Sequence, residues 1–434
     1  MSDQIPEGWT RTKFQDIAGL VKGLTYSTGD YASKDAGHPF ITLKCIQKNG
    51  GFSPRGLKYY SGKYKESQIV KAGDVVFANT DLTRDGDVVG SPLLVPFIPS
   101  DKPALISMDL SKVVPKNHQN GDFIYFWLQM DEVKRQMINL SAGSTVLHLN
   151  THDVPYLRLA APPISEQKKI AAILSSVDEV IEKTRAQIDK LKDLKTGMMQ
   201  ELLTKGIGHT EFKDTLIGHM PMSWSFTELG KVLIGIDSGW SPSCMEVKPG
   251  TGEWGVLKVS AVTRGEFLEN QSKALPRHLS PREKIKVNKG DLLLTRANGV
   301  ADLVGKCVIV SREPQAKLMM SDKILRLKPT KMLFNEFLLH VFNSSSTRKQ
   351  IELCWGGSSG QKNISQSDIN RFLIPLPPVA EQKVIAKSIT QIDYLLYDKN
   401  RKLQSLVISK KALMQDLLTG KVRVQVDTRE LTDA

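Results

Sequence analysis

The sequence predicts an α+β protein: two similar mixed α/β domains, each with a β core and small helices, separated by two long helices. Three observations support this. The chain has 434 residues, enough for two or three domains. A set of short motifs returns 215 residues later, at about half the chain length. Each copy ends in a segment of about 40 residues whose apolar side chains follow heptad spacing.

The repeat rests on anchors that share one offset. Pro162-Pro-x-x-Glu-Gln-Lys returns at Pro377, and Met-Gln-(Glu/Asp)-Leu-Leu-Thr returns in the same frame near the end of each copy. Pro-x-x-Trp at Trp9 returns at Trp224, and a Gly-Asp pair at Gly73 returns two residues further along, at Gly290. A repeat this long indicates two copies of a domain followed by a helix, and not a solenoid. We expect a first domain (1–161), a first helix (162–207), a linker with the second domain (208–376), a second helix (377–422) and a tail (423–434).

Each predicted domain contains short β-branched runs separated by Gly and Asn turns. Examples are Phe40–Lys44, Asp74–Phe77 and Ser91–Val95 in the first copy. One helix is predicted at Phe123–Leu140, and its counterpart at Asn335–Glu352.

The two long segments predict a helix pair. The prolines start each helix, an acidic residue lies in its first turn, and Gly206 and Gly420 can end it. Thr184 and Lys195 interrupt the first apolar seam, and Lys399 and Lys410 interrupt the second at matching positions. We expect the seams to pair as an antiparallel intramolecular coiled coil with internal pseudo-twofold symmetry; alternatively, each helix packs on its own domain. The residues assigned to helix pairing and partner docking are Pro163, Glu166, Gln167, Ile170, Leu174, Ile181, Leu191, Leu202, Pro378, Glu381, Gln382, Ile385, Ile389, Leu396, Leu406 and Leu417.

Charge and composition narrow the class of partner. The formal charge of +13 favours a polyanion, most commonly nucleic acid. No apolar run reaches 18 residues, and residues 1–9 do not resemble a signal peptide. The four cysteines form no C-x-x-C pair, which favours a reducing compartment. We therefore expect a cytoplasmic protein that does not bind membranes.

Sequences typical of catalysis are missing. The segment from Gly356 to Lys362 lacks the Gly-Lys pair of a phosphate-binding loop. No methyltransferase motif of the Asn-Pro-Pro-aromatic type occurs. His148 and His152 are four residues apart, but Asn150 and Pro155 make a loop more probable there than a metal-binding helix. We expect no catalytic residue, no metal site and no cofactor bound by this chain.

Three donor-rich segments occur in both halves at equivalent places, with different residues. Such side chains suit contacts to base edges and phosphates, although ordinary polar turns are the alternative reading. The candidate DNA-binding residues are Lys44, Gln47, Lys48, Asn79, Thr80, Arg84, Ser144, Thr145, His148, Lys258, Ser260, Arg264, Arg296, Asn298, Ser359, Gln361 and Lys362.

Together, these residues resemble the specificity subunit of Type I restriction-modification enzymes. The resemblance rests on the two Pro-Pro-x-x-Glu-Gln-Lys motifs, the two Leu-Leu-Thr helix ends, the Gly-Asp pairs and the Ser-Gly-Gln-Lys-Asn-Ile-Ser segment beginning at Ser359. The first half departs from this pattern, with Ser144-Thr-Val-Leu where the second has Ser-Gly-Gln-Lys.

The resemblance implies a specific division of labour. Each domain recognises one half of an asymmetric, bipartite site in double-stranded DNA, and the helices set the spacer between the half-sites. Two modification (methyltransferase) subunits and two restriction (ATP-dependent translocase and endonuclease) subunits dock on this scaffold. S-adenosylmethionine, ATP and magnesium belong to those partners. The main alternative is a stand-alone, two-domain DNA-binding regulator; an enzyme with its own nucleic-acid chemistry and a coiled-coil adaptor without a DNA role also remain open.

Overall fold

The computed structural model describes residues 5–48, 51–83, 85–355 and 362–426. The chain folds into two compact units, residues 1–185 with 401–434 and residues 186–400, which are described separately here. Among the described residues, no helix combines the length and apolar character required to cross a membrane.

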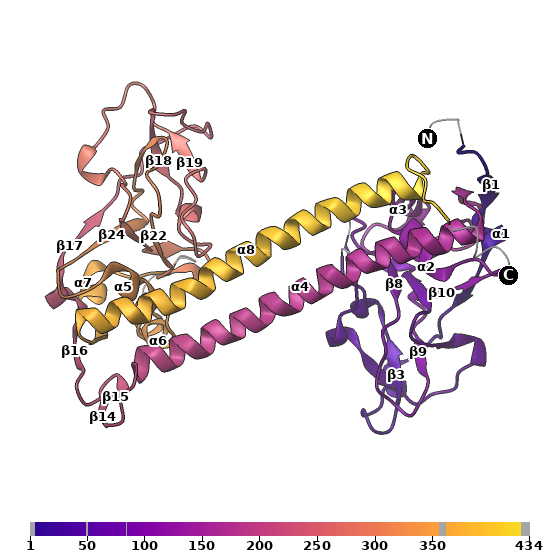
Figure 1. Ribbon diagram of the computed structural model, residues 1–434, viewed down its shortest axis with the longest axis horizontal. Helices are drawn as coiled ribbons and strands as arrows, with labels where there is room; N and C mark the ends of the chain where they lie inside the picture. Colours follow the sequence, from indigo (N-terminus) through magenta and orange to yellow (C-terminus); the bar gives the residue numbers. More distant parts are fainter. Residues whose placement is uncertain (1–4, 49–50, 84, 356–361, 427–434) are drawn as a thin grey trace. The chain divides into compact units, whose positions relative to one another are not determined.

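The first unit is a mixed α/β domain that carries one end of each long helix (Figure 1). Its elements are β1 (Thr10–Lys13), α1 (Phe14–Ile17), β2 (Ala18–Lys22), β3 (His38–Ile41), β4 (Lys58–Tyr60), β5 (Ile69–Val70), β6 (Val75–Ala78), β7 (Thr80–Asp81), β8 (Pro92–Leu94), β9 (Ala104–Ile106), β10 (Leu110–Pro115), α2 (Gly121–Leu128), α3 (Asp131–Asn139), β11 (Ser141–Ala142), β12 (Leu147–Leu149) and β13 (Arg158–Ala161).

The second unit follows a similar, though not identical, order after a hairpin. Its elements are β14 (Phe212–Thr215), β15 (Gly218–Pro221), β16 (Ser225–Glu228), β17 (Leu233–Ser238), β18 (Trp254–Leu257), β19 (Ser272–Ala274), β20 (Leu292–Thr295), β21 (Ala297–Asn298), β22 (Cys307–Ile309), β23 (Lys317–Met319), β24 (Ile324–Pro329), α5 (Asn335–Phe342), α6 (Ser345–Leu353), β25 (Lys362–Asn363), α7 (Gln366–Arg371) and β26 (Leu373–Leu376).

Both units are built around the same antiparallel four-stranded sheet. Its order is β2-β10-β6-β8 in the first unit and β17-β24-β20-β22 in the second. Strand β6 is buried along its whole length: Val75 and Phe77 face the core under α2 and α3, while Val76 and Ala78 face a second core. Strand β20 is buried in the same way, which explains why both strands are continuous apolar runs.

The predicted single helices are wrong in one respect, because each is two helices. The chain breaks between α2 and α3 at Met130, whose backbone is extended. It breaks again between α5 and α6, where the Ser344 side chain accepts a hydrogen bond from the Thr347 amide and caps α6. An extended residue in the first unit and a side-chain cap in the second thus divide the two predicted helices.

The long helices are α4 (Ile164–Thr204) and α8 (Val379–Leu418). Each starts directly after its Pro-Pro pair, as predicted. Each is followed by a glycine with positive φ, 66° at Gly206 and 71° at Gly420, which is the backbone expected just beyond a helix end.

Within each unit, the two helices run antiparallel and also pack on the domain. In the first unit, Ile170 and Leu174 of α4 meet Leu417 of α8 over Phe123 and Phe126 of α2 (Figure 1). In the second unit, the end of α4 and the start of α8 share a core with α5. Both packing arrangements considered from the sequence are therefore present, and the mixed fold with two long helices is confirmed.

The polar interruptions of the seam form matching ion pairs. Lys195 of α4 lies 2.5 Å from Asp393 of α8 in the second unit, and Lys410 of α8 lies 2.8 Å from Asp178 of α4 in the first. The two pairs are related by the repeat. Lys399 donates to Gln187, and Thr184 donates to the carbonyl of Val180 in its own helix.

Candidate nucleic-acid interface

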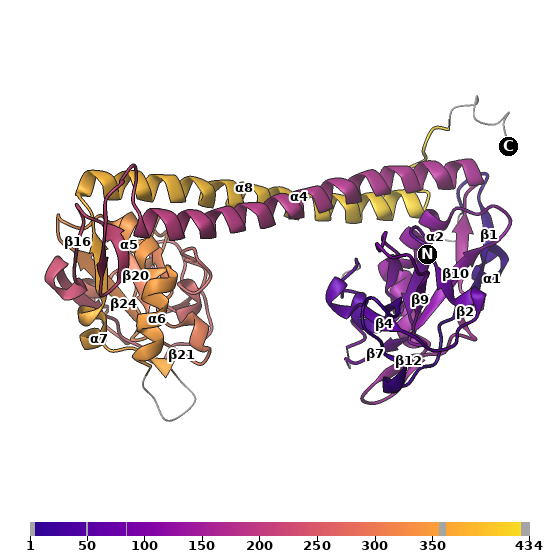
Figure 2. The ribbon, with the colours of Figure 1, turned by 90° about the horizontal axis from the view of Figure 1, so that it is seen from below.

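In the first unit, the donor-rich segments that contain Thr80 and His148 lie side by side. Strand β7 pairs with β12, with Thr80 opposite His148 and Asp81 opposite Leu147, and β12 also pairs with β11. This small ladder lies on the side of the unit away from α4 and α8 (Figure 2). Ser144, Thr145 and His148 are exposed along it, as a surface that contacts a partner requires.

The second unit forms an equivalent ladder. Strand β21 pairs with β25, with Ala297 opposite Asn363 and Asn298 opposite Lys362. Asn363 is the repeat equivalent of His148, so the two ladders share a frame but carry different side chains. Arg296 precedes β21 and is half-buried. The Lys362 ammonium lies 6.0 Å from the ring centroid of Trp355.

The donor-rich segment from Lys44 to Lys48 contacts the loop after β7 in the first unit. Lys48 forms an ion pair with Asp87, which lies in the loop after β7, and this contact raises the pKa of Lys48. Lys44 is exposed, and Gln47 donates to the carbonyl of Phe52.

In the second unit, the corresponding segment from Lys258 to Arg264 has different partners. Lys258 pairs with Glu246, Ser260 donates to Gln271, and Arg264 is exposed. The candidates Arg84, Ser359 and Gln361 lie outside the described residues.

Two candidates are buried, unlike the exposed side chains of the ladder. Asn79 and Thr80 are only 5% and 6% exposed, because they continue the buried strand β6 into β7. The Asn79 amide donates to the carbonyl of Met108, 3.2 Å away. These two side chains are buried in this structure, and their assignment to DNA contacts stays a prediction.

Asp81 was missed in the sequence and organises the loop after β7. Its carboxylate accepts hydrogen bonds from the amides of Thr83, Val88 and Val89 and from the Thr83 hydroxyl. Burial by itself would raise the pKa of Asp81, but these donors outweigh it and hold the pKa below its usual value. The signal was available as an Asp next to Thr at a turn, which is a common side-chain-to-backbone motif.

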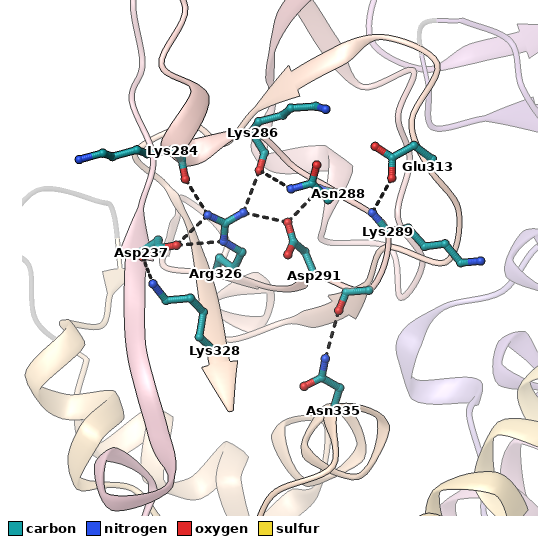
Figure 3. Close-up of polar contacts among 11 residues, drawn as sticks. Asp237, Lys284, Lys286, Asn288, Lys289, Asp291, Glu313, Arg326, Lys328 and Asn335 are labelled. Carbon is teal, nitrogen blue, oxygen red and sulfur yellow. Dashed lines mark hydrogen bonds and ion pairs between the residues drawn. The ribbon is translucent and has the colours of Figure 1, made fainter. Parts of the chain in front are cut away.

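The repeated Gly-Asp pairs connect the main sheet to the turn before it. In the second unit, Arg326 of β24 donates to Asp291, to Asp237 of β17 and to the carbonyls of Lys284 and Lys286 (Figure 3). Every N–H of the guanidinium is used.

In the first unit, a lysine links the Gly-Asp pair to the main sheet with fewer hydrogen bonds. There, Lys112 of β10 lies 2.7 Å from Asp74 and donates to the carbonyl of Ile69. The motif is therefore an internal brace in both units.

The Pro-Pro-x-x-Glu-Gln motif also acts inside the chain. In the first unit, the Trp9 indole donates to Glu166 at 3.0 Å, and Arg423 pairs with the same carboxylate. Gln167 is buried; it donates to the carbonyl of Pro162 and accepts from the amide of Asn120. These contacts fix the start of α4 against the domain.

The second unit repeats this arrangement with one substitution. Trp224 donates to Glu381 at 2.9 Å, and His209 replaces the arginine as the second partner of that carboxylate. Gln382 bonds the carbonyl of Pro377 and the amide of Phe334. In both units, the buried Gln side chain is used internally, whereas the prolines Pro163 and Pro378 are exposed.

The apolar residues assigned to helix pairing follow the predicted seam. The buried ones are Ile170, Leu174, Ile181, Ile385, Ile389 and Leu417, and the half-buried ones are Leu191, Leu202, Leu396 and Leu406. Leu203, Met414 and Leu418, which were not assigned, are also buried, because the domains cover the helix ends on a second side.

Comparison with known proteins identifies the family. The model of the Type I restriction modification DNA specificity domain matches residues 6–193 and 253–406. The chain belongs to this family. The tandem repeat corresponds to two specificity domains in one chain, so the resemblance seen in the sequence is confirmed.

Individual relatives match over nearly the whole chain. It is 27% identical to the Type I restriction enzyme EcoKI specificity subunit of Escherichia coli, covering 90% of this chain and 83% of the relative. It is 26% identical to the MjaVIII specificity subunit of Methanocaldococcus jannaschii, covering 97% and 95%.

A solved structure shares the fold. The S subunit of a Type I restriction-modification system from M. genitalium matches with a TM-score of 0.59 and 14% identity, covering 96% of this chain and 98% of that one. The relatives are specificity subunits. Because the chain belongs to the same family, the prediction that it is a DNA-recognition subunit and not itself an enzyme is confirmed. The domain boundaries and the individual DNA contacts stay predictions.

Proposed function

We propose that each unit recognises one half of a bipartite site in double-stranded DNA, with its ladder facing the major groove. The observation that carries this proposal is the pair of ladders, β7–β12 and β21–β25, which share a frame but differ in side chains. Two unlike reading surfaces in one chain suit an asymmetric site better than a palindrome. The formal charge of +13 favours the same polyanionic partner.

The subunit acts within a larger complex in the cytoplasm. A Type I specificity subunit works with modification and restriction subunits, and the internal repeat supplies two equivalent places for each, which favours two copies of both. S-adenosylmethionine would then be bound by the modification subunits, and ATP and magnesium by the restriction subunits. The chain itself contributes recognition and spacing.

Methylation mapping tests this function. Genomic DNA is sequenced by a single-molecule method from cells that express the chain with its modification subunit, and from cells that express the modification subunit alone. A split, asymmetric methylated site is expected only when the chain is present. If both proteins are soluble and associated but no new methylation appears, the proposal is wrong and a stand-alone DNA-binding regulator becomes the better hypothesis.

A further inference from the structure

In each unit, an exposed aliphatic side chain lies within two residues of the end of the ladder strand. Leu82 follows β7 and is 62% exposed; Val300 follows β21 by two residues and is 56% exposed. Isolated exposed apolar residues are common on protein surfaces. These two, however, each lie in the loop that follows the ladder strand of their own unit, beside polar side chains assigned to DNA recognition.

Hydrogen bonds brace the segment that follows Leu82 from both sides. Asp81, next to it, accepts hydrogen bonds from three backbone amides of the loop. On the other side of the loop, Lys134 of α3 donates to the carbonyl of Asp87 and to the Ser91 hydroxyl. The exposure of Leu82 therefore belongs to a braced loop.

The loop that carries Val300 is braced by other residues. The Asn298 side chain accepts a hydrogen bond from the Val300 amide at 2.9 Å. Arg348 of α6 donates to the carbonyls of Ala301 and Val304, at 3.0 and 2.7 Å. Two different sets of residues thus maintain the same result, an aliphatic side chain facing outwards beside the ladder.

Polar side chains cannot recognise every feature of a base pair. In the major groove, thymine is distinguished by its 5-methyl group, which is contacted by apolar side chains. We propose that Leu82 and Val300 are specificity-determining residues, each packing against the methyl group of a thymine in the half-site of its own unit. This inference rests on the proposed function.

Replacing thymine by deoxyuridine tests the inference, since this removes only the methyl group. Binding of the complex with its modification subunit is measured on the mapped site, with each thymine replaced in turn. The proteins are the unsubstituted chain, Leu82→Ala, Val300→Ala and, as a control, Leu216→Ala, whose side chain is 84% exposed on the β14–β15 hairpin. One replacement in each half-site should weaken binding by about three- to tenfold, as expected for one buried methyl group.

The variants assign each effect. With Leu82→Ala, deoxyuridine should no longer weaken binding in the half-site of the first unit, while its effect in the other half-site persists. With Val300→Ala, the effect should be lost only in the half-site of the second unit. With Leu216→Ala, the effects in both half-sites should be unchanged. If no thymine responds, or if the responses survive both substitutions, the inference is overturned while the proposed function stands. If the complex does not prefer the mapped site over a scrambled one, the proposed function fails as well.

Discussion

At the residue scale, the repeated motifs are mostly internal braces. Trp9, Glu166 and Arg423 meet at the start of α4, and the Gly-Asp pairs hold a basic side chain of the neighbouring strand. The repeat also shows where the units diverge. His340 of α5 occupies the place of Tyr125 of α2, and its imidazole lies 3.1 Å from the Thr390 hydroxyl under α8.

His340 should make stability depend on pH. Burial lowers its pKa to about 4; the charge of Asp393 opposes this shift, and the smaller effect of Lys195 adds to it. Because the unfolded chain binds this proton near pH 6.5, stability is complete above that value and falls as pH decreases towards 4, by about 3 kcal/mol. Denaturant unfolding between pH 4 and 8 measures this loss.

The variant His340→Tyr is the matched control, since the sister unit has Tyr at this place. It should flatten the profile between pH 4 and 6.5. A profile that stays as steep as that of the unsubstituted chain would assign the pH dependence to other groups.

At the element scale, α4 and α8 are held together by a narrow apolar seam with an ion pair near each domain. An apolar seam alone permits sliding by a heptad, whereas a polar position can specify register. The pairs Lys195–Asp393 and Lys410–Asp178 are placed to do this.

A charge exchange tests the role of one pair. Lys410→Asp should destabilise the chain by about 2 kcal/mol, because two carboxylates then face each other in a partly buried seam. Adding Asp178→Lys should restore about half of the loss. Thermal unfolding of the two variants measures this, and equal destabilisation by both would show that the pair does not act as a unit.

At the scale of the whole molecule, duplication makes recognition modular. The variant Arg296→Ala with Lys362→Ala should relax recognition of one half-site, at about 1–3 kcal/mol for each lost base contact. The other half-site should be unchanged. Methylation mapping of the variant measures both half-sites together, and a uniform loss over both would contradict modular recognition.

The helices should act as the spacer element. Because they run antiparallel, one heptad must be inserted in each, after Arg185 in α4 and after Asn400 in α8. Seven helical residues add about 10 Å, so the gap between half-sites should lengthen by up to about three base pairs. Mapping the methylated site of this variant gives the new gap, and an unchanged gap with both half-sites retained would show that the helices do not set it.

Sequence alone was sufficient for the duplication, the two long helices, the basic charge and the family. Each depends on periodicity or composition, which local sequence encodes. Which polar side chains are exposed depends on the tertiary structure. Asn79 and Thr80 looked like readers of DNA, yet pairing of β7 with β12, almost 70 residues later in the chain, buries them. The hydrogen bonds of Trp9 and Arg423 to Glu166 likewise join residues far apart in the sequence, which no local pattern can specify.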